Sequence, residues 1–311
     1  MLSRVANAVY WMSRYLERAD NVARFVHVNI HLMLDLGLEH DNGRWAPLVA
    51  ASGDDDDFRR RYDDPNEKNV LHFLTFDEEN PNSILSCIHR ARENARTVRE
   101  ILSSDLWMAI NDVHHLAQKQ ARRRKIGDLQ DFYLSIRRAG YVFTGLLEDT
   151  MTHGEAWHFA DLGRMLERAD KTARILDVKY FLLLPSLEYF DSPYDAVEWS
   201  AVLKSVSAFE MYLKQHHTIN YKNVADFLIF HPSFPRSILR CTHQAARSLH
   251  SIVATTGRET SVEGSMSTIR SFLADATIES VLNHGMHEFI DTFQTHINTL
   301  DRDIGQTFFA D

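Results

Sequence analysis

The chain has 311 residues, of which 44% are hydrophobic and 25% charged, and its formal net charge is −9. This length allows a sizeable core in one large domain or two average ones. The acidic balance argues against a nucleic-acid partner, which needs basic excess, and no apolar run is long enough for a membrane helix. Two cysteines, Cys87 and Cys241, form no disulfide framework, so we expect a cytoplasmic protein with both thiols in its core.

Helical periodicity dominates the chain. It contains only 12 glycines and 7 prolines, and apolar residues recur every three or four positions over long stretches, whereas strict alternation is rare. This pattern predicts an all-α protein. In chain order, the predicted helices cover about residues 4–38, a short segment from 45, 70–76, 84–102, 105–125, 128–146, 154–184, 194–216, 223–230, 235–254, 268–276 and 278–309.

Two segments are predicted as loops. The block of like charges from Asp54 to Asp57, followed by Arg59 to Arg61, favours a solvated loop over a cation site, because calcium loops space their carboxylates around a glycine. Residues 261–267 are the most loop-like part of the second half. Pro235 is predicted in the first turn of its helix, a favoured position for proline.

An eleven-residue charged segment occurs twice. Residues 14–24 read RYLERADNVAR and residues 164–174 read RMLERADKTAR, with eight identical positions, five of them charged. Further matches follow in the same order: 68–76 with 222–230, 83–89 with 237–243, and Trp45 with Trp199. The spacing is 150 residues for the charged segment and 154 for the later matches, which a four-residue insertion explains.

Two helical copies that each expose an apolar stripe can bury these stripes against each other. We therefore predict one compact multi-helix domain over residues 1–311. It would consist of internal repeats 1–149 and 150–311 related by a pseudo-two-fold axis. The alternative is two domains split near residue 150.

The charged segments are the main candidate site. On a helical wheel Arg14, Glu17, Asn21 and Arg24 lie within roughly 80° of each other, opposite the apolar stripe, with Arg18 beside them. The second copy repeats the arrangement with Arg164, Glu167, Arg168, Lys171 and Arg174.

These side chains allow two interpretations. Clustered arginines can clamp a carboxylate or phosphate while a glutamate positions a proton or an amine. Alternatively, they form a structural ion-pair face, either solvated or sandwiched between the halves, with Arg14 near Glu17 and Asp20 near Arg24 along the helix.

A third charged set lies at residues 90–100 and includes Glu93, Asn94 and Arg96. Its counterpart at 244–250 has lost nearly all of these groups. A single asymmetric site would produce this loss, and so would drift on a solvated face. Both interpretations stay open.

Metal-ligand spacings are present but incomplete. Glu155 and His158 have the Glu-x-x-His spacing of di-iron bundles, which need a second such motif, but the duplicate positions hold Asn7 and Ala8. His284 with His287, and His287 with Asp291, have same-face helical spacing, but each pair alone provides too few ligands for a metal site. No glycine-rich phosphate loop is present, so we predict no metal and no cofactor.

Taken together, the motifs resemble the bacterial alpha-E family. Residues 10–20, residues 93–96 with Trp107, and residues 154–157 leading into 164–170 carry this resemblance over essentially the whole chain, although Ser13 stands where the family usually has Gly. The family is all-helical, has no established reaction, and is found with circularly permuted ATP-grasp and transglutaminase-like proteins. The resemblance implies these proteins as partners and peptide or amide-bond metabolism as the setting. It selects Glu17, Glu93, Glu155, Glu167, Arg14, Arg18, Arg96, Arg164 and Arg168 as positions to test.

We therefore expect an enzyme or enzyme subunit that acts with an ATP-grasp ligase on an amino-acid or peptide substrate. Its catalytic candidates are Glu17, Glu167, Glu93 and Glu155. Its substrate-binding candidates are Arg14, Arg18, Arg24, Arg96, Arg164, Arg168, Arg174 and Asn94. The alternative is a non-catalytic helical binding or scaffold partner of an ATP-grasp or transglutaminase-like protein. Convergence of these groups on a concave pocket would favour the enzyme, whereas pairing across a dry interface would favour the partner.

Overall fold

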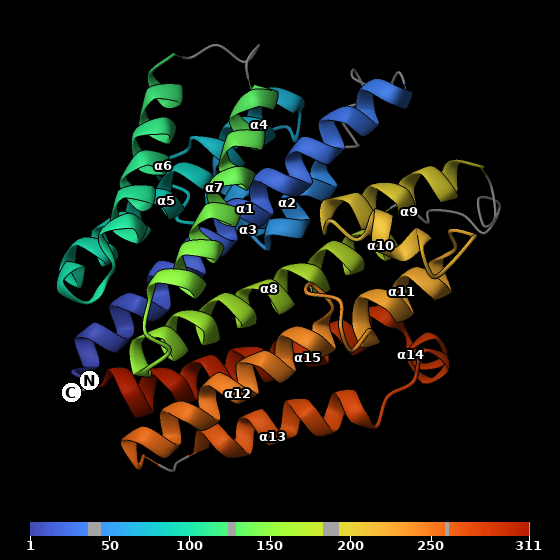
Figure 1. The fold of residues 1–311 in the computed structure, drawn as a ribbon. Coiled ribbons are helices and arrows are strands. Elements are labelled where there is room, and N and C mark those ends of the chain that lie inside the picture. Colours follow the sequence, from blue (N-terminus) through green and yellow to red (C-terminus); the bar gives the residue numbers. More distant parts are fainter. Residues whose placement is uncertain (37–44, 124–128, 183–192, 259–260, 311) are drawn as a thin grey trace.

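The computed structural model describes residues 1–36, 45–123, 129–182, 193–258 and 261–310 (Figure 1). Within these ranges the chain forms helices and no strand, which confirms the all-α prediction. A 3-10 turn, η2, covers Arg99–Ile101, and a π-helical turn, η5, covers Gly305–Phe309. The α-helices are α1 Ser3–Leu36, α2 Ala46–Ser52, α3 Asp55–Arg61, α4 Glu67–Thr75, α5 Ile84–Thr97, α6 Ser104–Arg123, α7 Leu129–Thr150, α8 Glu155–Leu182, α9 Pro193–Ser205, α10 Phe209–Leu213, α11 Tyr221–Phe230, α12 Ile238–Thr256, α13 Ser261–Ala274, α14 Ile278–His284 and α15 Met286–Ile304.

The long helices α1 and α8 pack against each other at the centre of the molecule (Figure 1). Helix α1 also packs against α5 and α7, and α8 packs against α12 and α15. The two ends of the described chain lie together (Figure 1), where the Ser3 hydroxyl is 3.4 Å from the Ala310 carbonyl oxygen. The charged segments on α1 and α8 therefore lie inside the protein.

Side-chain caps define several helix starts. Asn66 and Asn220 accept hydrogen bonds from the backbone of Asn69 and Asn223 at the start of α4 and α11. Ser83 and Ser237 cap α5 and α12 in the same way. Such caps satisfy backbone N–H groups that have no partner within the helix. The prediction that Pro235 lies in the first turn is wrong, because α12 begins at Ile238, after the cap.

Both predicted loops are helical. The acidic block forms the first turn of α3 and the three arginines form its last turn, an order that complements the helix dipole and explains why a charge run folds here. Residues 261–267 belong to α13, which buries Val262 and Met266. The two segments were predicted as loops from their charged and small residues. Such local composition does not reveal the packing that buries Phe58 of α3 or Val262 and Met266 of α13.

Some predicted helices are interrupted. The segment 194–216 divides into α9 and α10 at Ser207, whose φ is 53°. The segment 278–309 divides at Gly285, whose φ is 110°. Helix α5 ends at Thr97, earlier than predicted. The predicted helical residues 37–38, 124–125 and 183–184 lie outside the described residues.

The matched tryptophans Trp45 and Trp199 are both buried in the core. Cys87 and Cys241 are buried too, and burial raises the pKa of their thiols to about 12 and about 11. They are core thiols, as predicted. Among the helices described, none is long and apolar enough to cross a membrane.

Candidate functional site: a buried glutamate–arginine network

A glycine lets the two central helices approach closely. A Cβ atom at Gly163 on α8 would lie 2.6 Å from the Tyr10 carbonyl oxygen of α1 and 3.1 Å from Cγ of Arg14. Real Cβ atoms do not come that close to a carbonyl oxygen. This contact brings the charged segments of α1 and α8 within hydrogen-bonding range of each other.

Glu17 accepts hydrogen bonds from two arginines of the second half of the chain. Nε and Nη2 of Arg168 lie 2.8 and 2.7 Å from its two carboxylate oxygens, forming a bidentate pair. Nη1 of Arg236, from the segment before α12, lies 3.0 Å from Oε1, as does the side-chain amide of Asn21. The Glu17 carboxylate is buried and has charged or polar donors on both oxygens.

Glu167 is held by two arginines of α1. Nε and Nη2 of Arg18 lie 2.6 and 2.9 Å from its two oxygens, and Nε of Arg14 lies 3.0 Å from Oε2. Glu167 is fully buried. The Glu-Arg dipeptides at 17–18 and 167–168 thus exchange partners between α1 and α8.

Further ion pairs extend the network on both sides. Arg24 holds both oxygens of Asp20, at 2.7 and 2.8 Å, and Arg236 reaches the same carboxylate at 2.7 Å. On the opposite side Arg14 pairs with Asp301 of α15 at 2.5 Å, and Tyr10 donates to Asp301 at 2.6 Å.

The second charged segment has its own outer pairs. Arg164 pairs with Asp161 at 2.8 Å and Arg174 with Asp170 at 3.0 Å. Lys171 donates to the carbonyl oxygen of Ser52 at 3.1 Å. The network therefore connects α1 and α8 to α2, to the segment before α12 and to α15.

The electrostatics keep both glutamates ionised. Burial alone would raise the pKa of Glu17, but Arg168 and Arg236 outweigh it and hold the pKa well below its usual range. Burial is likewise outweighed at Glu167, where Arg18, Arg14 and Lys171 lower the pKa. Both side chains are therefore permanent anions near neutral pH.

The structure brings most of the candidate residues together. Glu17, Glu167 and the arginines at 14, 18, 24, 164, 168 and 174 all lie in this network. Of the two pairs expected along α1, the one between Asp20 and Arg24 forms. Arg14 instead reaches across to Glu167 of α8 and Asp301 of α15, because these two helices offer it carboxylates.

Four candidates lie elsewhere. Glu93 pairs with Arg92 and Arg96 on the outer face of α5, at 2.8 and 2.7 Å, and Asn94 is its neighbour on that helix. Glu155, at the start of α8, accepts from the amino group of Met1 at 2.8 Å.

Several members of the network were not predicted from the sequence. Arg236 and Asn82 occupy matching positions just before the capping serines Ser237 and Ser83. Arg236 contacts Glu17, and Asn82 accepts from Arg18. The two positions are separated by 154 residues like the other matches, but one holds Asn and the other Arg, so no shared residue type marks them as a pair. Asp301 carries no such signal.

Within the described part of the chain, no three His, Cys, Asp or Glu side chains are grouped to hold a metal ion. Nδ1 of His158 lies 3.4 Å from the Ser248 hydroxyl, and Nδ1 of His287 lies 3.0 Å from Asp177. These histidines therefore contact residues that the metal-ligand spacings did not include.

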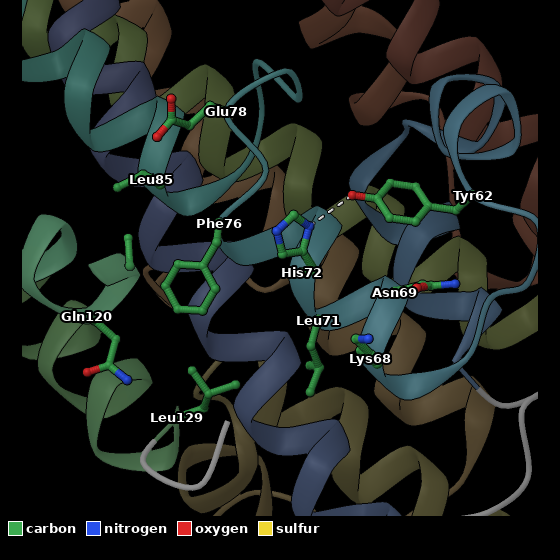
Figure 2. Close-up of a pocket in the computed structure, with 11 residues that line it drawn as sticks. Tyr62, Lys68, Asn69, Leu71, His72, Phe76, Glu78, Leu85, Gln120 and Leu129 are labelled. Atoms are coloured by element: carbon green, nitrogen blue, oxygen red, sulfur yellow. Dashed lines mark hydrogen bonds between the residues drawn. The ribbon is translucent and has the colours of Figure 1, made fainter. Parts of the chain in front are cut away.

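A cavity of about 610 Å³ is lined by residues of α4, α5, α6 and α7 (Figure 2). Tyr62 and His72 line it and are joined by a 2.9 Å hydrogen bond, while the Tyr62 hydroxyl also donates to Asp77. Burial and Asp77 raise the pKa of Tyr62 to about 12. None of the candidate site residues is among those lining this cavity.

Fold and site together define an all-helical protein whose two longest described helices are joined by buried Glu–Arg pairs. The chain belongs to the Alpha-E family, whose description is a predicted alpha-helical domain with a conserved ER motif, and the match covers residues 1–309. The Glu-Arg dipeptides at 17–18 and 167–168 are the two in this sequence.

Relatives of the chain are bacterial. It is 25% identical over 188 residues to an uncharacterized protein of Mycobacterium bovis, which covers 53% of this chain and 21% of that protein. Two uncharacterized proteins of Mycobacterium tuberculosis match with the same coverage at 25% and 24% identity. The chain thus spans about a fifth of the length of these relatives. No solved structure matches it.

Proposed function

We propose that this protein is a non-catalytic helical partner of an ATP-grasp or transglutaminase-like protein, and that its Glu–Arg motifs hold its two central helices together. One observation carries the proposal: both motif glutamates are buried and receive arginine hydrogen bonds from the opposite helix. This is the dry pairing expected of a structural network.

The chemistry of the pairs supports a structural role. A general base works best when its pKa lies near the operating pH, but the arginines lower the pKa of Glu17 and Glu167 instead. A substrate carboxylate would also have to displace Glu17 or Glu167 from its bidentate arginine, which costs strong charge-assisted hydrogen bonds. The motif is therefore better suited to fixing a helix pair than to turnover.

We further propose that the two halves are copies related by a pseudo-two-fold axis. The exchange of partners between Arg18–Glu167 and Arg168–Glu17 supports this relation. So do the matched helix caps and the matched packing of α1 on α5 and of α8 on α12. One rigid body would then result from the duplication, with outer surfaces free for a partner.

The alternative proposal is an enzyme or enzyme subunit that acts with an ATP-grasp ligase on an amino-acid or peptide substrate. It would assign proton transfer to Glu17 or Glu167 and binding to the arginines around them. That assignment needs the central pairs to open during turnover, because both glutamates are buried in the closed arrangement.

A comparison of Glu17→Gln with Glu93→Gln separates the two proposals. Each variant is mixed with a candidate ATP-grasp or transglutaminase-like protein, ATP and amino acids, and unfolding, complex formation and amide product are measured. We expect Glu17→Gln to lower the free energy of unfolding by about 3–5 kcal/mol, because it leaves Arg168 buried without its carboxylate partner and leaves Arg236 with Asp20 alone. Complex and product should fall only in proportion to the folded protein.

Glu93→Gln is the matched control, because it makes the same chemical change on an outer face. Its free energy of unfolding should stay within about 0.5 kcal/mol of the wild type. The proposal is overturned if Glu17→Gln unfolds at the wild-type midpoint, forms the complex and yields no amide.

A further inference from the structure

A second cavity, of about 720 Å³, opens between α1, α7, α9 and α10. Its volume is in the range of small-molecule sites. The residues lining it include His27, His31, Arg137, Lys204, Ser207 and Glu210. We propose that this cavity binds a small ligand through an oxyanion group, either a carboxylate or a phosphate.

The charges that line the cavity favour an anion. Arg137 and Lys204 have no carboxylate partner among the described residues, and Lys204 lies 5.2 Å from the ring centre of Phe209 instead. Among the described residues that line the cavity, Glu210 is the one acidic side chain, and it is exposed to solvent. In contrast, the arginines of the central network all have carboxylate partners.

A relay of hydrogen bonds orients the two histidines. Nη1 of Arg137 lies 3.3 Å from Nδ1 of His27, and Nε2 of His27 lies 3.2 Å from Nε2 of His31. Because Arg137 is a donor only, a neutral His27 carries its proton on Nε2 and donates it to His31. His31 then has its own proton on Nδ1, where it can be donated to an anion.

The backbone of Ser207 is the strained point of the site. Helix α9 ends there in a Schellman motif, with Ala208 N bonded to Leu203 O at 2.7 Å and Ser207 N to Lys204 O at 3.0 Å. Glycine usually occupies this left-handed position, but here a serine has φ 53°. Strained residues persist where the surrounding structure requires them, often at ligand sites.

The serine side chain explains why glycine is absent. Its hydroxyl accepts from Nη1 of the fully buried Arg24 at 2.5 Å, and the same Nη1 donates to the Tyr141 hydroxyl at 3.0 Å. Arg24 also holds Asp20 of the central network. Ser207, which lines the cavity, is thus connected through Arg24 to the central network.

Calorimetric titration of the chain alone tests the site, so its outcome is independent of the proposed partner. Sodium sulfate, inorganic phosphate and succinate are compared at constant ionic strength. A single oxyanion should bind with a Kd on the order of 1 mM. Tighter binding of phosphate and sulfate would indicate a phosphate ligand, and tighter binding of succinate a carboxylate ligand.

Arg137→Gln should weaken binding about tenfold or more, because it removes charge-assisted hydrogen bonds. Arg138→Gln is the matched control, since Arg138 is exposed on the same helix and does not line the cavity. Ser207→Gly should keep the fold, because glycine accepts this φ without strain, but should also weaken binding. Absence of saturable binding in the wild type, or equal binding by the Arg137 and Arg138 variants, would refute the site.

Discussion

Arg24 and Arg174 occupy the same place in the two charged segments but have different surroundings. Arg24 is fully buried and contacts Asp20, Ser207 and Tyr141. Arg174 pairs with Asp170 and keeps 26% of its side chain exposed. Identity of residue type therefore did not determine the environment, because each environment depends on helices far away in the sequence.

Tyr141 should titrate abnormally. Partial burial raises its pKa, but the hydrogen bond and charge of Arg24 outweigh this, and Ser207 and Arg137 add to the effect, so the pKa falls to about 8. Because the folded-state pKa lies below the unfolded value of about 10, this group adds stability above pH 10 and loses it as the pH falls through 8.

Ultraviolet titration measures this ionisation directly. The wild type should show one phenol ionising near pH 8 that is missing in Tyr141→Phe. An unchanged curve in Tyr141→Phe would mean that Arg24 does not stabilise the phenolate.

The two sides of the central network place their extra cation on different elements. Beside Glu17, Asn21 is neutral and Arg236 supplies the charge. On the other side Asn82 is neutral, and Lys171 on α8 lies 3.5 Å from Asp170. Asn21 corresponds to Lys171 in the repeat, and Asn82 corresponds to Arg236. Each pair of matching positions thus holds one neutral and one cationic residue, so that one extra cation lies beside each glutamate.

Helix α8 depends on a close approach that one glycine permits. Gly163→Ala should destabilise the protein by about 1–3 kcal/mol, because the added methyl group meets the Tyr10 carbonyl oxygen at 2.6 Å. Gly145→Ala on α7 is the matched control, since no atom lies within 4 Å of its added Cβ. That change should stabilise by about 0.5–1 kcal/mol through helix propensity.

Chemical denaturation of both variants checks this prediction. A Gly163 variant that is as stable as the wild type would show that α1 and α8 can separate slightly without loss of their ion pairs.

Periodicity was enough to predict most helices, because their buried faces repeat every three to four residues. It failed where tertiary contacts decide. At Ser207 a left-handed residue ends α9, and the hydroxyl contact with Arg24 that accompanies it lies outside any local pattern. The charged segments could be found by their identity, but the cross-pairing of Arg18 with Glu167 and the roles of Arg236 and Asp301 required the packing of distant helices.

Neither half of the chain can neutralise all of its own buried charges. Arg18 has its carboxylate partner on the second half, and Arg168 has its partner on the first. Fragments 1–150 and 151–311 should therefore lack cooperative unfolding alone and recover a single transition when mixed. Circular dichroism of each fragment and of the mixture measures this.

The alternative outcome has a clear meaning. If each fragment unfolds cooperatively at the midpoint of the intact chain, residues 1–150 and 151–311 are two independent domains.

Because Ser3 and Ala310 are in contact, the two halves could be joined in the opposite order along the chain. The turn between α7 and α8 is exposed at Thr152 and His153, so a circular permutant could begin at His153, pass through a short linker from Ala310 to Ser3, and end at Thr152. Exposed turns and adjacent termini are where such rearrangements succeed. The reordered polypeptide would retain the Glu–Arg pairs, since they are made between helices that the new connection leaves whole.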